Sequence, residues 1–393
     1  MDELTLRYGC NPHQAPARAW VPEGDLPIRV LNGSPGYINL LDALNSWRLV
    51  KDLKQATGLP AAASFKHLSP AGAALGLPIE EGSDLARALF PPKGVELSPL
   101  ACAYVRARGA DRVSSFGDWA ALSNVVDVPT ARALKIEVSD GVIAPGFEPE
   151  ALAILSAKKG GKYSAIEVDP TFEPPAVESR QVFGITLEQP ENGWVPGDEF
   201  PGEIVSARKD LSTNARNDLI LAALTVKYVQ SNSIVAASGG QVLGAGAGQQ
   251  SRIHCTRLAC GKADLWWLRQ HPRVLALPFR EKLRRPERDN SIDQFLLTRQ
   301  PQAVEDLWLE NFARRPPLRL TEDEKREWIA KRNGLALASD AFFPFRDSLD
   351  RAAESGVEYV VHAGGSLRDE ETVAAADEHG MLLAHSGIRL FHH

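Results

Sequence analysis

The sequence predicts an α/β fold, because apolar runs of strand length alternate with segments of helical periodicity. Ile28 to Leu31 fits a short strand, and Asn32 to Gly36 supplies turn residues after it. Ala61 to Phe65 is a second run of strand length, and Gly58 and Pro60 end the helical segment between the two. Such alternation is typical of α/β domains.

The helix between these strands begins near Leu40 and carries apolar residues at helical spacing, whereas Asp42, Arg48 and Lys51 are expected to face solvent. Later in the chain the pattern predicts further helices at three places: Asn217 to Tyr228, the segment with Trp266 and Trp267, and the segment opened by the capping box of Thr321 and Glu324. Further strands are expected at four places: Ser233 to Ala237, Gln241 to Leu243, Tyr359 to Val361 and Met381 to Ala384. The first two form a hairpin through Ser238-Gly239-Gly240, and Val168 to Pro175 is expected to be a linker.

Length and composition narrow the class of protein. A chain of 393 residues favours two or three domains, and 44% apolar with 24% charged residues indicates a globular protein. A net charge of −6 does not favour a nucleic-acid partner. The start shows no secretory signal, and the longest largely apolar stretch, Leu219 to Val226, is far below the ~20 residues of a membrane span. Four cysteines without a C-x-x-C pair argue against disulfides and a thiolate zinc site, so a cytoplasmic enzyme without membrane partner is expected.

Lys66-His67 is the sharpest local feature, because it stands where a buried strand ends. A histidine can accept a proton near neutral pH, and an adjacent lysine can stabilise developing negative charge. The alternative is a structural histidine beside a solvated lysine.

Each of two other segments can be interpreted either as a binding site or as an ordinary structural element. Gly244 to Gly248, followed by Arg252, could hold an anion on free N–H groups, although a flexible turn explains it as well. Ser339 to Asp347 joins three aromatic residues to two acids, which suits either a core or the wall of a site for a flat heterocycle. Arg389 to His393 could be a frayed tail, and the motif of zinc deaminases is absent.

Taken together, these segments resemble one family closely. The matching motifs run in order along the chain: Arg7 to Gln14, Ser64 to Gly72, Lys227 to Ser233, Gly246 to Cys255, Ser339 to Asp347 and Arg389 to His393. The chain resembles the transformylase part of the bifunctional purine-synthesis family, which formylates 5-aminoimidazole-4-carboxamide ribonucleotide (AICAR). The resemblance extends essentially from Arg7 to His393.

The resemblance implies an α/β fold of two cytidine-deaminase-like units lacking zinc, joined by a partly helical middle segment. The expected boundaries are 1–175 for the first unit, 176–270 for the middle segment with hairpin and glycine-rich loop, and 271–393 for the second unit. It also implies a homodimer with active sites at the interface, and a separate IMP cyclohydrolase, since the sequence offers no room for that domain before Arg7.

The family's site residues fall on named positions of this sequence. Its catalytic residues fall on Lys66, His67 and Asn232. Its nucleotide-binding residues fall on Arg7, Tyr8, Gly117, Asp140, Arg252, Asn290, Phe342 and Arg389. Its folate-side residues fall on Ile253, Pro344, Asp347 and Ser366.

Two positions depart from the family's pattern. Gly364 stands where a serine is expected, which removes a hydroxyl from the folate side. Members of the family can hold potassium near Ser231, Ser233, Asp340 and Leu390. Val229 replaces a threonine beside that position, so the sequence commits to no metal, and a monovalent cation stays open.

The reaction implied is formyl transfer from the co-substrate 10-formyltetrahydrofolate to the 5-amino group of AICAR, giving formyl-AICAR and tetrahydrofolate in de novo purine synthesis. His67 would act as general base, Lys66 would stabilise the oxyanion or the departing N10, and Asn232 would orient His67 or the formyl oxygen. Two rivals remain: an enzyme that uses formate and ATP, against which the lack of a P-loop counts, and a non-catalytic nucleotide-binding protein.

Overall fold

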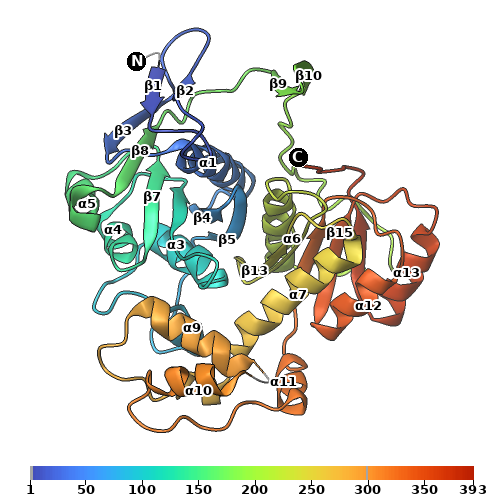
Figure 1. The fold of residues 1–393 in the computed structure, drawn as a ribbon. Coiled ribbons are helices and arrows are strands. Elements are labelled where there is room, and N and C mark those ends of the chain that lie inside the picture. Colours follow the sequence, from blue (N-terminus) through green and yellow to red (C-terminus); the bar gives the residue numbers. More distant parts are fainter. Residues whose placement is uncertain (1–2, 298–299) are drawn as a thin grey trace.

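A computed structural model describes residues 3–297 and 300–393 and has at its centre a mixed sheet of twelve strands (Figure 1). The strand order is β11-β16-β15-β14-β12-β13-β5-β4-β6-β7-β8-β3. The bounds of these strands are β3 (Ile28–Asn32), β4 (Ala61–Lys66), β5 (Ser69–Leu75), β6 (Asp118–Leu122), β7 (Ser139–Ala144), β8 (Ser164–Val168), β11 (Glu203–Ile204), β12 (Ile234–Ser238), β13 (Gln241–Gly246), β14 (Leu335–Ser339), β15 (Val357–His362) and β16 (Leu382–His385). Two separate ribbons complete the strands, β1 (Glu3–Leu6) with β2 (Ala17–Trp20) and β9 (Val177–Val182) with β10 (Ile185–Pro190).

The sheet consists of two halves with the same topology. In each half three parallel strands are flanked by an antiparallel hairpin on one side and an antiparallel edge strand on the other. The halves meet at β5 and β13, which pair at one position, Gln241 opposite Ala74. The prediction of a mixed α/β fold is therefore confirmed, whereas the likeness to cytidine deaminases stays a prediction.

Helices cover both faces of the sheet. The helices are α1 (Tyr37–Thr57), α2 (Asp84–Leu89), α3 (Pro99–Ala110), α4 (Val128–Lys135), α5 (Pro149–Ser156), η1 (Lys158–Gly161), α6 (Thr213–Val226), α7 (Arg252–Leu268), α8 (Pro272–Leu275), α9 (Arg285–Leu296), α10 (Gln302–Leu309), α11 (Glu322–Ile329), α12 (Asp347–Glu354) and α13 (Asp369–Glu378). On one face α1 and α6 share a single apolar core with strands of both halves. On the other face each half has its own core, under α3 to α5 in the first and under α7, α12 and α13 in the second. Helices α8 to α11 form a small bundle with a fourth core (Figure 1).

Most of the elements predicted from sequence are present. The capping box at Thr321 is confirmed: its hydroxyl accepts the N–H of Glu324 at 3.2 Å, and the Glu324 carboxylate accepts the N–H of Thr321 at 2.8 Å. The hairpin through Gly239 and Gly240 is also confirmed, and both glycines have positive φ. The domain boundaries stay a prediction. Strands from before and after residue 175, and from before and after residue 270, belong to the same central sheet.

Three expectations were wrong. Gly244 to Gly246 belongs to β13 instead of a loop, because α7 packs so closely that a Cβ at Gly244 would lie 2.1 Å from the Ala259 carbonyl oxygen. Asp42 does not face solvent but is buried. The C-terminal segment is not frayed, because Leu390 is buried and donates its N–H to the Asp340 carbonyl at 2.8 Å.

Within the described residues, no helix combines the length and apolar character needed to cross a membrane.

Candidate functional site

The Lys66-His67 segment lies at the two-residue turn between β4 and β5. His67 and Leu68 occupy the turn with φ of 51° and 64°, which is the left-handed region that side chains other than glycine rarely adopt. Both side chains are exposed at the tip. Residues held in this region cluster at functional sites, since the surrounding structure must stabilise them.

Asp42 on α1 supplies that stabilisation. Its Oδ1 accepts the N–H of Leu68 at 2.7 Å from below the turn. Burial raises the pKa of Asp42, and this effect is partly opposed by the Leu68 hydrogen bond and by the nearby charges of His67 and Lys66. Asp42 is thus a positioning residue for the turn, one that the sequence analysis missed.

The second half of the chain repeats this device without the functional side chains. Asp218 on α6 accepts the N–H groups of Gly239 and Gly240 at 2.8 Å and 2.7 Å, and it is as buried as Asp42. Glycines adopt the left-handed turn at no steric cost, so the second turn needs no anchor to enforce it. Only the first half places a histidine in the strained position.

Lys66 reaches from the turn toward the start of β6. Its Nζ donates to the Gly117 carbonyl oxygen at 2.7 Å. Gly117 has φ of 70°, and a Cβ there would lie 3.1 Å from the same Nζ and 3.9 Å from an Asp140 carboxylate oxygen. The structure thereby brings Lys66, Gly117 and Asp140 together, and Asp140 also pairs with Lys159 at 2.6 Å.

Asn290 lies on α9 at a cavity of about 400 Å³ beside this group. The cavity is also lined by Phe116, the neighbour of Gly117. The adjacent Asp289 is buried and accepts from Arg112 at 2.8 Å and from Arg269 at 2.9 Å. Burial alone would raise the pKa of Asp289, but the two guanidinium groups bring it below its usual value. These ion pairs hold α9, and with it Asn290, against the segments that directly follow α3 and α7. We call Lys66, His67, Gly117, Asp140 and Asn290 the turn cluster.

A second cavity, of about 620 Å³, lies at the N-terminal end of α7. It brings together seven of the predicted residues: Asn232, Arg252, Ile253, Phe342, Pro344, Asp347 and Arg389. We call it the α7 cavity. The aromatic residues of the segment after β14 have two different locations. Phe343 is buried in the core, whereas Phe342 and Phe345 line the cavity.

Buried polar contacts fix Asn232 within this cavity. Its Nδ2 donates to the Gln249 carbonyl at 2.9 Å, and its Oδ1 accepts from Arg252 at 2.9 Å. The Arg252 guanidinium also pairs with Asp340, whose second oxygen accepts from the Ser231 hydroxyl at 2.6 Å and the Ser233 N–H at 3.0 Å. An amide nitrogen has two donors, so Asn232 keeps one N–H for a ligand.

The resemblance implies a potassium site in the same neighbourhood. The Ser233 hydroxyl oxygen is buried and has no hydrogen-bond partner among the described residues, so an oxygen donor exists there. The Asp340 carboxylate, however, already neutralises Arg252. In the described part of the chain, no group of three or more His, Cys, Asp or Glu side chains could hold a metal ion.

The turn cluster and the α7 cavity are two separate groups in the structure. None of the residues of the turn cluster lines the α7 cavity. The turn lies at the start of β5 and the cavity lies beyond the end of β13, and these two strands are neighbours in the central sheet.

Three of the predicted binding residues belong neither to the turn cluster nor to the α7 cavity. Arg7 and Tyr8 follow β1 and contact each other, with the guanidinium carbon 5.8 Å from the ring centroid. Ser366 lies in the loop after β15, where its hydroxyl accepts the Arg368 N–H at 3.1 Å. In the same loop Gly364 packs on His385, and a Cβ there would lie 2.8 Å from that ring, which accounts for the absence of a serine.

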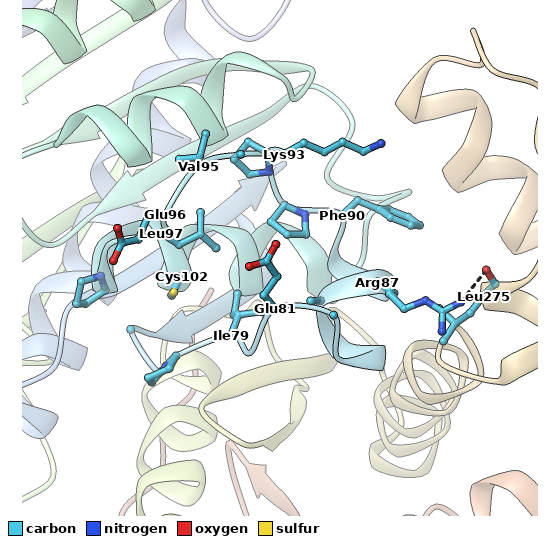
Figure 2. A pocket seen from close by; sticks show the side chains of 18 of the residues that line it. Ile79, Glu81, Arg87, Phe90, Lys93, Val95, Glu96, Leu97, Cys102 and Leu275 are labelled. Carbon is cyan, nitrogen blue, oxygen red and sulfur yellow. Dashed lines mark hydrogen bonds between the residues drawn. The ribbon is translucent and has the colours of Figure 1, made fainter.

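A further cavity of about 950 Å³, whose lining residues are drawn in Figure 2, is indicated by no motif of the sequence, and none of the predicted site residues lines it. The proline-rich loop before α3 forms much of its wall, with Cys102 buried among apolar side chains. Its charged residues Glu81, Arg87, Lys93 and Glu96 are exposed at the rim. Burial raises the pKa of Cys102, so the thiol is not an activated nucleophile.

One family model and several known proteins are similar to the chain. The model of the AICARFT/IMPCHase bienzyme family matches residues 1–262. The bifunctional purine biosynthesis protein PurH of Dinoroseobacter shibae is 32% identical over 396 residues, which cover 99% of this chain and 59% of that protein. Proteins of the same name from two strains of Cereibacter sphaeroides match with the same identity and coverage.

The chain thus spans about three fifths of the length of the curated relatives that it matches. Because those relatives are bifunctional, they do not support the expectation of a separate cyclohydrolase, and the lack of a cyclohydrolase domain stays a prediction.

Proposed function

Because the chain belongs to the AICARFT/IMPCHase bienzyme family, we propose that it transfers the formyl group of 10-formyltetrahydrofolate to the 5-amino group of AICAR in purine synthesis. The observation that carries this proposal is the grouping of the expected residues into two sites of complementary chemistry. A proton acceptor and a cation lie in the turn cluster, and aromatic, amide and guanidinium groups line the α7 cavity.

A second copy of the chain would join the two sites. Each group has a large apolar side chain exposed beside it. Phe116 is 52% exposed beside the turn cluster, and Phe345 is 50% exposed at the α7 cavity. Large exposed apolar groups around polar functional residues are typical of a surface that another molecule covers. In a twofold dimer, the turn cluster of one protomer would face the α7 cavity of its partner, giving two identical sites.

We assign the steps of this reaction to the side chains of the two groups. The amine nitrogen of AICAR attacks the formyl carbon, and His67, exposed at the tip of its turn, accepts the proton that the amine loses. The Lys66 ammonium stabilises the tetrahedral oxyanion, to which Asn232 donates its remaining N–H. When the intermediate collapses, the bond from carbon to N10 breaks, and N10 takes up a proton to leave tetrahydrofolate. Arg7 and Arg389 suit the nucleotide phosphate, because guanidinium groups bind phosphate in a fork.

Steady-state assays separate this function from its rivals. We expect formyl-AICAR to form from AICAR and 10-formyltetrahydrofolate without ATP. If product forms only with formate and ATP, the chain is an ATP-dependent enzyme that takes its formyl group from formate. Nucleotide binding without turnover would indicate a regulatory protein.

Mixing two inactive variants tests the shared site. A heterodimer of His67→Ala and Asn232→Ala chains has one site with both changes and one site with neither. After subunit exchange in an equal mixture, activity should return to about a quarter of the wild-type value, since half the dimers carry one intact site. No recovery, with heterodimers shown to form, would mean that each chain builds its own site.

A further inference from the structure

The cavity of Figure 2 lies between the segment that leads from β5 into α3 and the small helical bundle. Leu275 on α8 and Arg288 on α9 form its wall on the side of the bundle. No residue of the turn cluster or of the α7 cavity lines it. Its volume of about 950 Å³ lies within the range of small-molecule sites, which is about 300–1,000 Å³. We call the space lined by parts of residues 76–102, by Leu275 and by Arg288 the bundle cavity.

The inner wall of the bundle cavity is apolar and rigid. Ile79 and Leu97 are partly buried and pack against the core under α3. Pro91 and Pro92 belong to the loop that forms the wall, and the proline ring fixes φ. A loop that is fixed before a ligand arrives loses little conformational entropy when the ligand binds.

Arg288 brings a cation to this wall. Its guanidinium carbon lies 3.7 Å from the ring centroid of Phe90, and its Nε is buried without a hydrogen-bond partner among the described residues. The adjacent carboxylate of Asp289 is bound by Arg112 and Arg269. Burial lowers the pKa of Arg288 to about 10, and the charge of Asp289 opposes only part of that effect. A partly buried guanidinium with a free N–H favours an anionic ligand, because burial of an unpaired charge is costly.

Phe90 holds the Arg288 guanidinium in place at the wall. Its φ of 54° lies in the left-handed region, which side chains other than glycine rarely adopt. The conformation ends α2, and the Phe90 N–H donates to the Ala86 carbonyl at 3.0 Å. The ring lies between two cations, since the Arg112 guanidinium carbon is 5.5 Å from the same centroid. Strained residues of this kind cluster at ligand sites, where the surrounding structure stabilises them.

The other charged side chains of the bundle cavity are exposed at its rim. Arg87 and Lys93 are cationic there, and Glu81 and Glu96 are anionic. Water and salt screen exposed charges strongly, whereas a partly buried charge is screened much less. We therefore expect Arg288 to determine which sign of charge the cavity prefers.

We propose that the bundle cavity binds a small organic anion, with its anionic group on Arg288 and a flat apolar body against Ile79 and Leu97. The site is separate from the proposed formyl transfer. Arg288 and Asn290 are two residues apart on α9, so they project to different sides of the helix.

The test uses two probes with the same ring system and opposite charge, naphthoate and naphthylmethylammonium. Calorimetry should show one-to-one binding of naphthoate to the wild-type chain, at least about 10-fold tighter than binding of the cation. Arg288→Leu keeps an apolar side chain on Phe90 and should weaken naphthoate binding at least about 10-fold. The matched control Arg284→Leu removes an exposed charge from the residue just before α9 and should leave the affinity near the wild-type value.

Four results of these titrations would overturn the proposal. They are an absence of naphthoate binding to the wild-type chain, tighter or equal binding of the cation, equal weakening by the two variants, and an unchanged affinity of Arg288→Leu.

A second variant places the probe and covers the case in which Arg288→Leu fails to fold. Val95→Trp introduces a large side chain from the loop that lines the bundle cavity, and it should abolish naphthoate binding. Saturating AICAR and tetrahydrofolate should leave naphthoate binding to the wild-type chain unchanged. Naphthoate that binds Val95→Trp as tightly as the wild type, or that AICAR and tetrahydrofolate displace, would show that the probe lies elsewhere and would refute the proposal.

Discussion

Removal of the Asp42 carboxylate is expected to slow formyl transfer while the fold persists. The Leu68 N–H lies 2.7 Å from Asp42 Oδ1, and His67 and Leu68 both have positive φ. A hydrogen bond to a charged group is worth about 1.5–3 kcal/mol, which is comparable to the cost of one strained residue. Without this anchor, the fraction of molecules that hold His67 in place should fall about 10- to 100-fold.

The assay is steady-state kinetics of Asp42→Ala with AICAR and 10-formyltetrahydrofolate, with thermal unfolding measured on the same samples. We expect kcat to fall by about 10- to 100-fold, with a smaller change in KM for AICAR, because the Asp42 side chain anchors the turn of His67 and Leu68 and bonds none of the expected nucleotide-binding residues. Asp218→Ala is the matched control, since it removes an equally buried carboxylate from the corresponding turn of the second half. Both variants should lose some stability, and only Asp42→Ala should lose kcat. Equal effects of the two changes on kcat, or no effect of either, would refute the positioning role.

Three further expectations concern the site and its support. His67→Ala should lower kcat roughly 10²–10⁴-fold if His67 is the general base, while calorimetry should show AICAR binding less affected than in Arg389→Ala; a near-normal kcat would exclude His67 as the base. Burial raises the pKa of Asp218 from 3.8 to about 6. The folded chain therefore binds a proton that the unfolded chain has already lost, and this group's contribution to stability falls as pH rises from about 4 to 6. Asp218→Asn should flatten that slope in urea unfolding, and identical slopes would contradict the burial argument. Arg252→Ala should cost about 3–5 kcal/mol of unfolding free energy, because it leaves Asp340 buried without its cation. Adding Asp340→Ala should restore part of the loss, so strictly additive losses would show that the pair is not coupled.

The strands and helices were predictable where a local pattern decides the structure. The apolar run Ala61 to Phe65, the Gly239-Gly240 hairpin and the capping box at Thr321 are signals read within a few residues. The glycines of β13 led to the wrong prediction of a loop, because a glycine gives the same local signal in a flexible loop and in a strand on which a helix packs closely. Contact with Ala259 distinguishes the two, and that contact depends on the tertiary fold.

The site residues were assigned one by one through the family resemblance, and their roles stay a prediction. The sequence did not indicate that they form two groups, because Lys66 ends a strand of the first half whereas Asn232 precedes a strand of the second half. Asp42 was missed for a similar reason. Its helix pattern places it among solvent-facing residues, and only the turn formed 26 residues later covers it. The ribbon of β9 and β10 was not predicted either, because the alternating pattern of an exposed ribbon looks like that of any half-buried strand.

The core that α1 and α6 share has a consequence for turnover. Leu49 and Leu53 of one helix and Leu221 and Leu224 of the other pack in a single apolar layer under strands of both halves. The halves therefore cannot hinge against each other without exposing that layer to water, and the offset between the turn cluster and the α7 cavity is rigid. If two chains share each site as proposed, substrates enter and products leave through changes at the boundary between protomers. The strength of the contact between protomers would then influence how fast the site can open.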